Sequence, residues 1–194
     1  MTDFDPDLKG TWVADPAHSS IGFVARHAMV TKVRGDFTDY SVTIEAVPDD
    51  LEKSTVEVRL RAASLDTRNS DRDTHLRSAD FFNVEKWPEI VFRSTAVEEI
   101  DEGALMVTGD LTIRDVTKRI TVPVDFTGFS TDPVAKTKRA GFEGSRRVNR
   151  RDFGLEWNVP LDTGGVLVSE KITIEFEVSA VPKDAVAAPD VESE

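Results

Sequence analysis

The sequence predicts an all-β protein that forms an antiparallel β-barrel of about eight strands. At least six stretches alternate apolar and polar residues with a period of two, and very little of the chain has helical periodicity. The clearest stretch is residues 171–180, where every second side chain is apolar. A sheet of such strands has exposed edges unless it closes on itself, and a barrel of about eight strands has room inside for side chains or one small ligand.

The N-terminal half contains four predicted strands. Residues 10–15 form a short first strand, which ends at Asp15-Pro16, a dipeptide that favours a turn. Residues 33–46 are expected to form one strand that pairs back on residues 20–30, and residues 55–62 form the next half-buried strand. In the second strand, the side chains expected on the inner face are Ile21, Phe23, Ala25, His27 and Met29.

One short helix is expected over residues 70–82. Ser70 and Asp73 form a capping signal at its start, and good helix formers follow them. Leu76 and Phe82 share a face, so the helix is expected to pack over the sheet or over an open end of the barrel.

The C-terminal half resumes the strands at residues 90–97, 104–114, 119–129, 139–148 and 171–180. Hairpin-type turns are expected at residues 114–117 and at Gly164-Gly165. At 194 residues, the chain is expected to form a single barrel domain over residues 10–182. A short extension, residues 1–9, precedes it, and the composition of the acidic tail, residues 183–194, is typical of disorder.

Charge and composition narrow the class of partner. The net charge of −12 disfavours a nucleic-acid partner, because phosphate binding requires a basic face. The chain has no cysteine, its N-terminus lacks the pattern of a secretory signal, and no apolar run approaches ~18 residues. A cytoplasmic protein without a membrane span is therefore expected.

One basic segment, residues 136–151, stands out from this acidic background. It carries seven Lys and Arg residues and one Glu. Such a segment could attract a phosphate, a carboxylate head group or an anionic membrane surface. The alternative is an ordinary solvated face of two neighbouring strands, which is the commoner meaning of a charge run.

Signals for catalysis and for metal binding are poor. No GxSxG elbow, phosphate loop, HExxH motif or cysteine nucleophile occurs. His18, His27 and His75 lack short metal-ligand spacing, so no metal site and no catalytic residue are expected. Arg72 and Asp73 lie close to His75 on the predicted helix, and helix capping with an ion pair is the simplest explanation.

Aromatic residues on or beside the predicted elements have two interpretations. Each alone is explained by core packing, whereas together they could line a cavity for a lipophilic ligand. These residues are Phe23, Phe81, Phe82, Phe92, Phe126, Phe142, Phe153 and Trp157.

Several motifs, in order along the chain, resemble the YceI-like family. They lie at residues 12–23, Gly35-Asp36-Phe37, 72–82, 88–92, 109–113 and 151–155. The resemblance implies an extended, lipocalin-like barrel whose pore holds a long isoprenoid chain, such as a polyprenyl lipid or the tail of a quinone. It also implies that the segment with His75, Leu76, Phe81 and Phe82 lies near the barrel mouth. Asp115 stands at a turn position where family members commonly have glycine, and aspartate also tolerates turn conformations.

The resulting expectation is a non-enzymatic protein that binds, stores or transports an isoprenoid lipid or quinone and needs no other cofactor. Transient membrane contact and a homodimer are further expectations. Head-group contacts are expected from Arg72, His75 or residues 146–151. Two alternatives stay open: a barrel enzyme with His27 or His75 as general base, or a solid-core structural protein. The residues expected to contact the ligand are Phe23, His27, Arg72, His75, Leu76, Phe81, Phe82, Phe92, Phe126 and Phe153.

Overall fold

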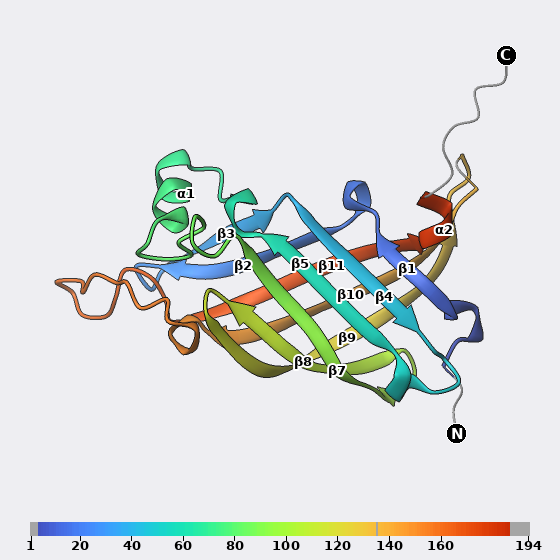
Figure 1. The fold of residues 1–194 in the computed structure, drawn as a ribbon. Helices are drawn as coiled ribbons and strands as arrows, with labels where there is room; N and C mark the ends of the chain where they lie inside the picture. The colour runs from blue at the N-terminus through green and yellow to red at the C-terminus, as the bar shows by residue number, and fades with distance from the viewer. Residues whose placement is uncertain (1–3, 135, 187–194) are drawn as a thin grey trace, which may run out of the picture.

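The computed structural model describes residues 4–134 and 136–186. The strands in these ranges belong to one antiparallel sheet (Figure 1). Eight strands in these ranges close into a barrel in the order β1-β4-β5-β7-β8-β9-β10-β11, because β1 pairs with both β4 and β11. The predicted barrel is thus confirmed. Strands β2, β3 and β6 continue the sheet from β11. The strand bounds are β1 Gly10–Ala14, β2 Ser20–His27, β3 Thr31–Phe37, β4 Tyr40–Ala46, β5 Thr55–Arg61, β6 Leu65–Asp66, β7 Glu89–Asp101, β8 Ala104–Ile113, β9 Val116–Thr131, β10 Lys138–Asn149 and β11 Lys171–Pro182.

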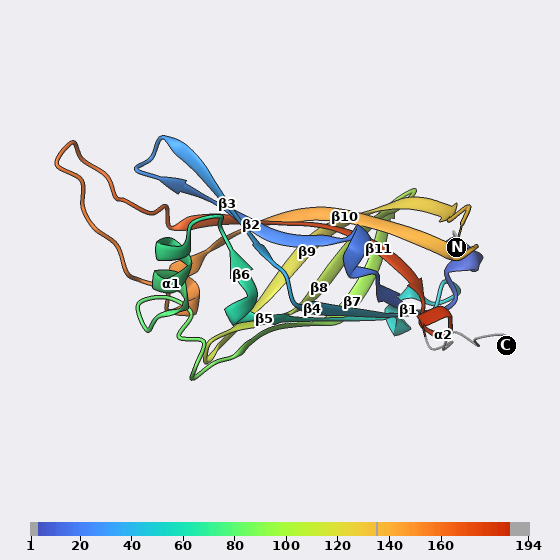
Figure 2. The same ribbon diagram turned by 90° about the horizontal axis from the view of Figure 1, so that it is seen from above.

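The barrel is closed at one end and flared at the other. Strand β11 pairs with β1 only at residues 180–182 and with β2 at residues 173–177. Strands β9 and β10 pair up to Val124 and Gly144 and then separate. Figure 2 shows the result, in which the layer of β2, β3, β10 and β11 diverges from the layer of β4, β5, β7, β8 and β9 toward helix α1 (Ser70–Arg77).

Aromatic side chains fill the closed end. Phe4, Leu8 and Trp12 are buried, and the indole Nε1 of Trp12 donates to the carbonyl oxygen of Leu8 at 2.7 Å. The ring of Phe4 lies 5.4 Å from that of Phe126, which in turn contacts Phe142 at 5.4 Å between centroids. The side chains of Phe4 and Leu8 therefore belong to the core of the barrel, whereas residues 5–7 between them are exposed.

Helix α1 stands at the flared end, as expected for a helix near the mouth (Figure 1). The side chain of Asn69 caps it by accepting from the backbone N–H of Arg72 at 2.9 Å. The helix ends at Arg77, not at residue 82 as predicted, because Ser78 adopts an extended backbone conformation. Tight turns follow, which bring Phe81 and Phe82 over the barrel end.

Two further predictions are corrected. Residues 33–46 form two strands, β3 and β4, because the chain bends at Thr38 and Asp39, whose backbone N–H groups are bound by Ser64. Strand β4 then pairs with β1 and β5, not with β2. Part of the predicted irregular tail, Lys183–Val186, forms a short helix, α2, and residues 187–194 lie outside the described residues.

The expected turns are confirmed in the structure. Ile113 pairs with Val116 across a two-residue turn in which Arg114 has a φ of 58°. Gly164 and Gly165 both adopt a positive φ, of 85° and 87°. Within the described part of the chain, the helices are too short and too polar to cross a bilayer.

The closed end offers a test of the fold. Phe4→Ala should lower the free energy of unfolding by about 3–5 kcal/mol, because it leaves a cavity among the rings that seal the barrel. Urea unfolding followed by circular dichroism measures this change. Ile100→Ala removes an exposed apolar side chain and should leave the midpoint unchanged. Equal midpoints for the two variants would contradict the role of Phe4 as a plug.

Candidate ligand-binding cavity

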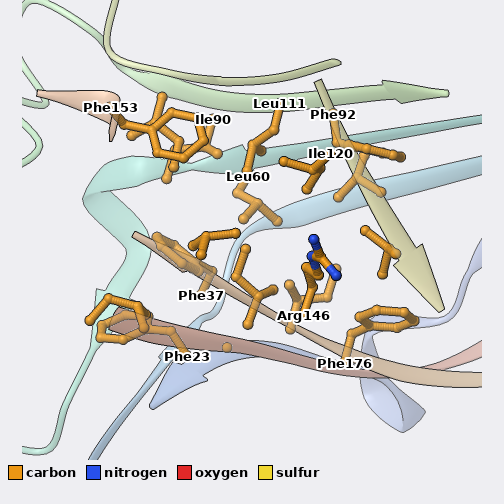
Figure 3. Close-up of a pocket in the computed structure, with 18 of the residues that line it drawn as sticks. Phe23, Phe37, Leu60, Ile90, Phe92, Leu111, Ile120, Arg146, Phe153 and Phe176 are labelled. Atoms are coloured by element: carbon orange, nitrogen blue, oxygen red, sulfur yellow. The ribbon is translucent and has the colours of Figure 1, made fainter. Parts of the chain in front are cut away.

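A cavity of about 280 Å³ lies between the diverging layers (Figure 3). Apolar side chains line it from every strand except β1 and β6, with Leu76 of α1 and the segment after β10 added at the flared end. Arg146 and Arg150 are the charged residues on its wall. An apolar cavity with few polar groups is the usual form of a site for a lipophilic ligand. The interior of the barrel is therefore not fully packed, which disfavours the solid-core alternative.

Three glycines on the wall leave room for aromatic rings, which keeps these rings out of the centre of the cavity. A Cβ built on Gly35 would lie 2.5 Å from Cζ of Phe23, and one on Gly109 would lie 2.5 Å from Cζ of Phe92. Gly144 and Phe176 form a third such pair, at 2.6 Å. Because each ring packs against bare backbone of the neighbouring strand, it does not need to reach across the lumen.

A second set of side chains covers the flared end. Phe81 and Phe153 are buried and line the cavity, together with Leu76, Phe82 and Leu155. His75 packs edge-on against Phe81 and Trp157, with ring centroids 5.1 and 4.5 Å away. These contacts tie α1 to the segment after β10 and make a cover over the lumen.

Arg150 holds that segment in place. It is buried, and its guanidinium donates to the carbonyl oxygens of Leu155, Val168 and Ser169. Burial lowers the pKa of Arg150, and the nearby carboxylate of Glu170 opposes this effect. The three carbonyls occupy donors on all three nitrogens of its guanidinium, so Arg150 has a structural role in the cavity wall.

The structure brings six of the ten expected contact residues onto the cavity wall. These are Phe23, Leu76, Phe81, Phe82, Phe92 and Phe153. Their contact with a ligand stays a prediction.

The other four lie elsewhere. His27 was expected on the inner face, but it is exposed, because the β2–β3 hairpin extends past the barrel and pairs with Val168 of the loop. Phe126 belongs to the closed end. Arg72 donates to the side chain and carbonyl of Thr67, and Nε2 of His75 lies 2.9 Å from Oδ2 of Asp80 on the outside of the cover.

The basic segment divides into residues with different roles. Lys138 pairs with Asp7 at 2.9 Å, Arg139 with Asp15 at 2.6 Å, and Arg151 with Glu170 at 2.9 Å. Arg146 instead faces the lumen. The described residues contain no group of three His, Cys, Asp or Glu side chains placed to hold a metal ion.

Comparison with known proteins identifies the family. The sequence profile of the YceI-like domain matches residues 12–180, which is most of the chain and nearly the whole barrel. The chain belongs to the YceI-like family. A UPF0312 protein of Staphylococcus aureus is 35% identical to it over 166 residues, covering 86% of this chain and 93% of that protein.

Solved structures of YceI-like proteins have the same fold. The YceI protein of Campylobacter jejuni is 32% identical, with a TM-score of 0.70 over 87% of this chain and 96% of that one. A polyisoprenoid binding domain from Saccharophagus degradans is 14% identical, with a TM-score of 0.68 over 88% and 98% of the two chains. The second likeness concerns the fold alone. Phe4 and Leu8 of the closed end precede the segment that the family profile matches.

The pairing of rings with glycines can be tested by substitution. Gly35→Ala should lower the free energy of unfolding by about 1–3 kcal/mol, because the new methyl group displaces the ring of Phe23 into the lumen. Adding Phe23→Leu should restore most of the loss, since the smaller side chain leaves room for the methyl group. Thermal or urea unfolding of the two single variants and the double variant measures the coupling. Strictly additive losses would contradict the proposed packing.

Proposed function

We propose that the protein binds a long-chain isoprenoid lipid, such as a polyprenyl lipid or an isoprenoid quinone, inside the barrel and carries or stores it without turnover. The single observation that carries this proposal is the apolar cavity between the two layers of the barrel. The cavity supports an apolar chain as ligand. The shared fold with a polyisoprenoid binding domain supports an isoprenoid as the kind of chain.

The energetics favour such a ligand. Burying ~20 methylene equivalents at ~0.8 kcal/mol each contributes on the order of 16 kcal/mol. Association costs roughly 4 to 15 kcal/mol. At the lower association costs, an apolar tail alone gives useful affinity, and the polar groups on the wall then influence which head group binds.

The positions of the histidines support binding rather than turnover. A general base must lie within hydrogen-bond reach of the group that it deprotonates. His27 is exposed beyond the barrel, and His75 meets Asp80 outside the cover. The cavity wall of the described residues carries arginines but neither histidine nor carboxylate. The enzyme alternative would have to recruit one of these histidines by a rearrangement of the cover.

The first experiment identifies the ligand directly. The purified protein should retain a stoichiometric isoprenoid lipid or quinone, seen by native mass spectrometry of the intact chain and by mass spectrometry of an organic-solvent extract. An empty extract, together with no thermal stabilisation by added polyprenyl lipids, would contradict the proposed function.

A pair of variants on β4 tests whether the lipid lies in the cavity. Ile44 faces the lumen, whereas Thr43 is the adjacent residue on the outer face of the same strand. Ile44→Trp should lower the affinity for a polyprenyl lipid at least about tenfold, because the indole fills space that the tail needs. Thr43→Trp should bind like the wild type. Binding is measured by titration with the lipid, and equal affinities for both variants would place the ligand elsewhere.

The flared end also carries exposed apolar side chains suited to contact with a lipid bilayer. Met29 and Val30 form the tip of the β2–β3 hairpin, with 53% and 74% of their surface exposed. Val159 is exposed on the neighbouring segment, which is tied to the hairpin by a bond from Ala28 N to Leu167 O. We propose that this tip enters the bilayer interface while lipid passes through the flared end.

Transfer kinetics test this contact. Replacing both Met29 and Val30 by Ser should slow transfer from zwitterionic phosphatidylcholine vesicles several-fold and leave the equilibrium affinity unchanged, because neither residue lines the cavity. Ile100→Ser changes an exposed side chain near the β7–β8 turn and should not affect the rate. Equal transfer rates for all three proteins would contradict a role for the hairpin tip.

A further inference from the structure

Arg146 differs from the rest of the cavity wall. On β10, Phe142, Arg146 and Val148 occupy alternate inward positions, and Arg146 lies opposite Ile174 of β11, which also lines the lumen. Figure 3 shows its guanidinium in the lumen among apolar side chains. The side chain of Arg146 is exposed, so its donors can be reached by water or by a ligand. A cation therefore projects into a space that is otherwise apolar.

The guanidinium of Arg146 has no partner among the described residues. In the same basic segment, Lys138, Arg139 and Arg151 pair with Asp7, Asp15 and Glu170. Arg150, the other charged residue on the wall, is bound to three carbonyl oxygens. Arg146 alone thus offers free donors to whatever occupies the cavity of the described structure.

A free guanidinium in an apolar space favours one kind of ligand atom. It carries five N–H donors and no acceptor. Leaving these donors unpaired beside a bound hydrocarbon costs free energy, because a charge is taken out of water without compensation. A carboxylate or a phosphate matches the planar fork of donors with two parallel hydrogen bonds.

The position of Arg146 places the head group inside the barrel. It lies two residues beyond Gly144, the last residue of β10 that pairs with β9. Phe142 of the closed end and Arg150 of the cover are each four residues away along the chain, or about 13 Å at ~3.3 Å per residue. A head group bound there lies midway along the lumen, where β9 and β10 begin to separate, and not at the mouth.

We propose that Arg146 binds a compact anionic oxygen head group, a carboxylate or a phosphate, within the lumen. The ligand class is then an acidic long-chain isoprenoid rather than an isoprenoid alcohol or quinone. This inference rests on the proposed function and adds the chemistry of the head group and its place. Arg146 is a specificity-determining residue in this arrangement, while the apolar wall supplies most of the affinity.

Four probes with the same number of isoprene units test the inference: geranylgeraniol, geranylgeranoic acid, geranylgeranyl phosphate and menaquinone-4. The wild type should bind the acid, the phosphate or both at least about tenfold more tightly than the alcohol and the quinone. Arg146→Met should abolish this preference and still bind the alcohol. Arg147→Met is the matched control, because Arg147 is the next residue and lies on the outer face opposite Thr173; it should keep the preference.

Stability gives a second measurement. Without ligand, Arg146→Met should melt at the same temperature as the wild type or higher, because an unpaired charge has been replaced by an apolar side chain. If Arg146 had only a structural role, Arg146→Met would instead melt at a lower temperature than the wild type. Which acid is preferred distinguishes a carboxylate from a phosphate as the natural head group.

The outcomes separate the two proposals. Equal affinity of the wild type for all four probes, a preference for the quinone, or an unchanged preference in Arg146→Met would overturn the inference and leave lipid binding intact. Failure of the wild type to bind any of the four would overturn the proposed function as well.

Discussion

The structure depends on how β11 is paired. One edge of β11 pairs with β10, and the other edge is shared between β1 and β2. Its last residues pair with β1 and close the barrel, whereas residues 173–177 pair with β2. Since β2 and β3 are not paired with β4, the ring of hydrogen bonds opens toward α1. The aromatic plug around Phe126 and Phe142 can then seal one end while the cover formed by Phe81 and Phe153 spans the other. The cavity exists because the same edge of β11 pairs with β1 at one end and with β2 at the other.

Side-chain volume decides whether such a barrel is hollow. Protein interiors are packed close to the density of organic crystals, so an interior with many phenylalanines would be expected to fill itself. Gly35, Gly109 and Gly144 prevent this, because each leaves a bare patch of wall on which a ring lies. The Gly35-Asp36-Phe37 and Gly109-Asp110-Leu111 motifs therefore have a physical meaning. The glycine leaves room for a ring from the preceding strand, and the residue two positions later lines the lumen.

Much of the fold could be predicted from alternation, and its failures have particular causes. The strands near residues 104–114 and 171–180 are correct because one face is apolar throughout. The alternation predicts one strand over residues 33–46, although the inward set changes from Phe37 to Val42 and Ile44, so that the phase shifts by one residue at the bend. That shift was the available signal. The bond from Thr38 to the distant Ser64 could not be foreseen, since it depends on the tertiary fold.

The candidate site shows the same limit. The aromatic motifs could be predicted to line a cavity. The inward placement predicted for His27 is wrong, because alternation does not reveal where the opposite wall of the barrel ends. Arg146 was hidden in a run of basic residues, although counting by two from Phe142 places it inward. Two kinds of interaction therefore have different effects. Apolar burial is nondirectional and sets how tightly a chain is held, whereas the hydrogen bonds of one guanidinium are directional and select the head group. On the wall formed by the described residues, the one unpaired guanidinium would make the proposed site selective for the head group and the apolar side chains would accept any tail.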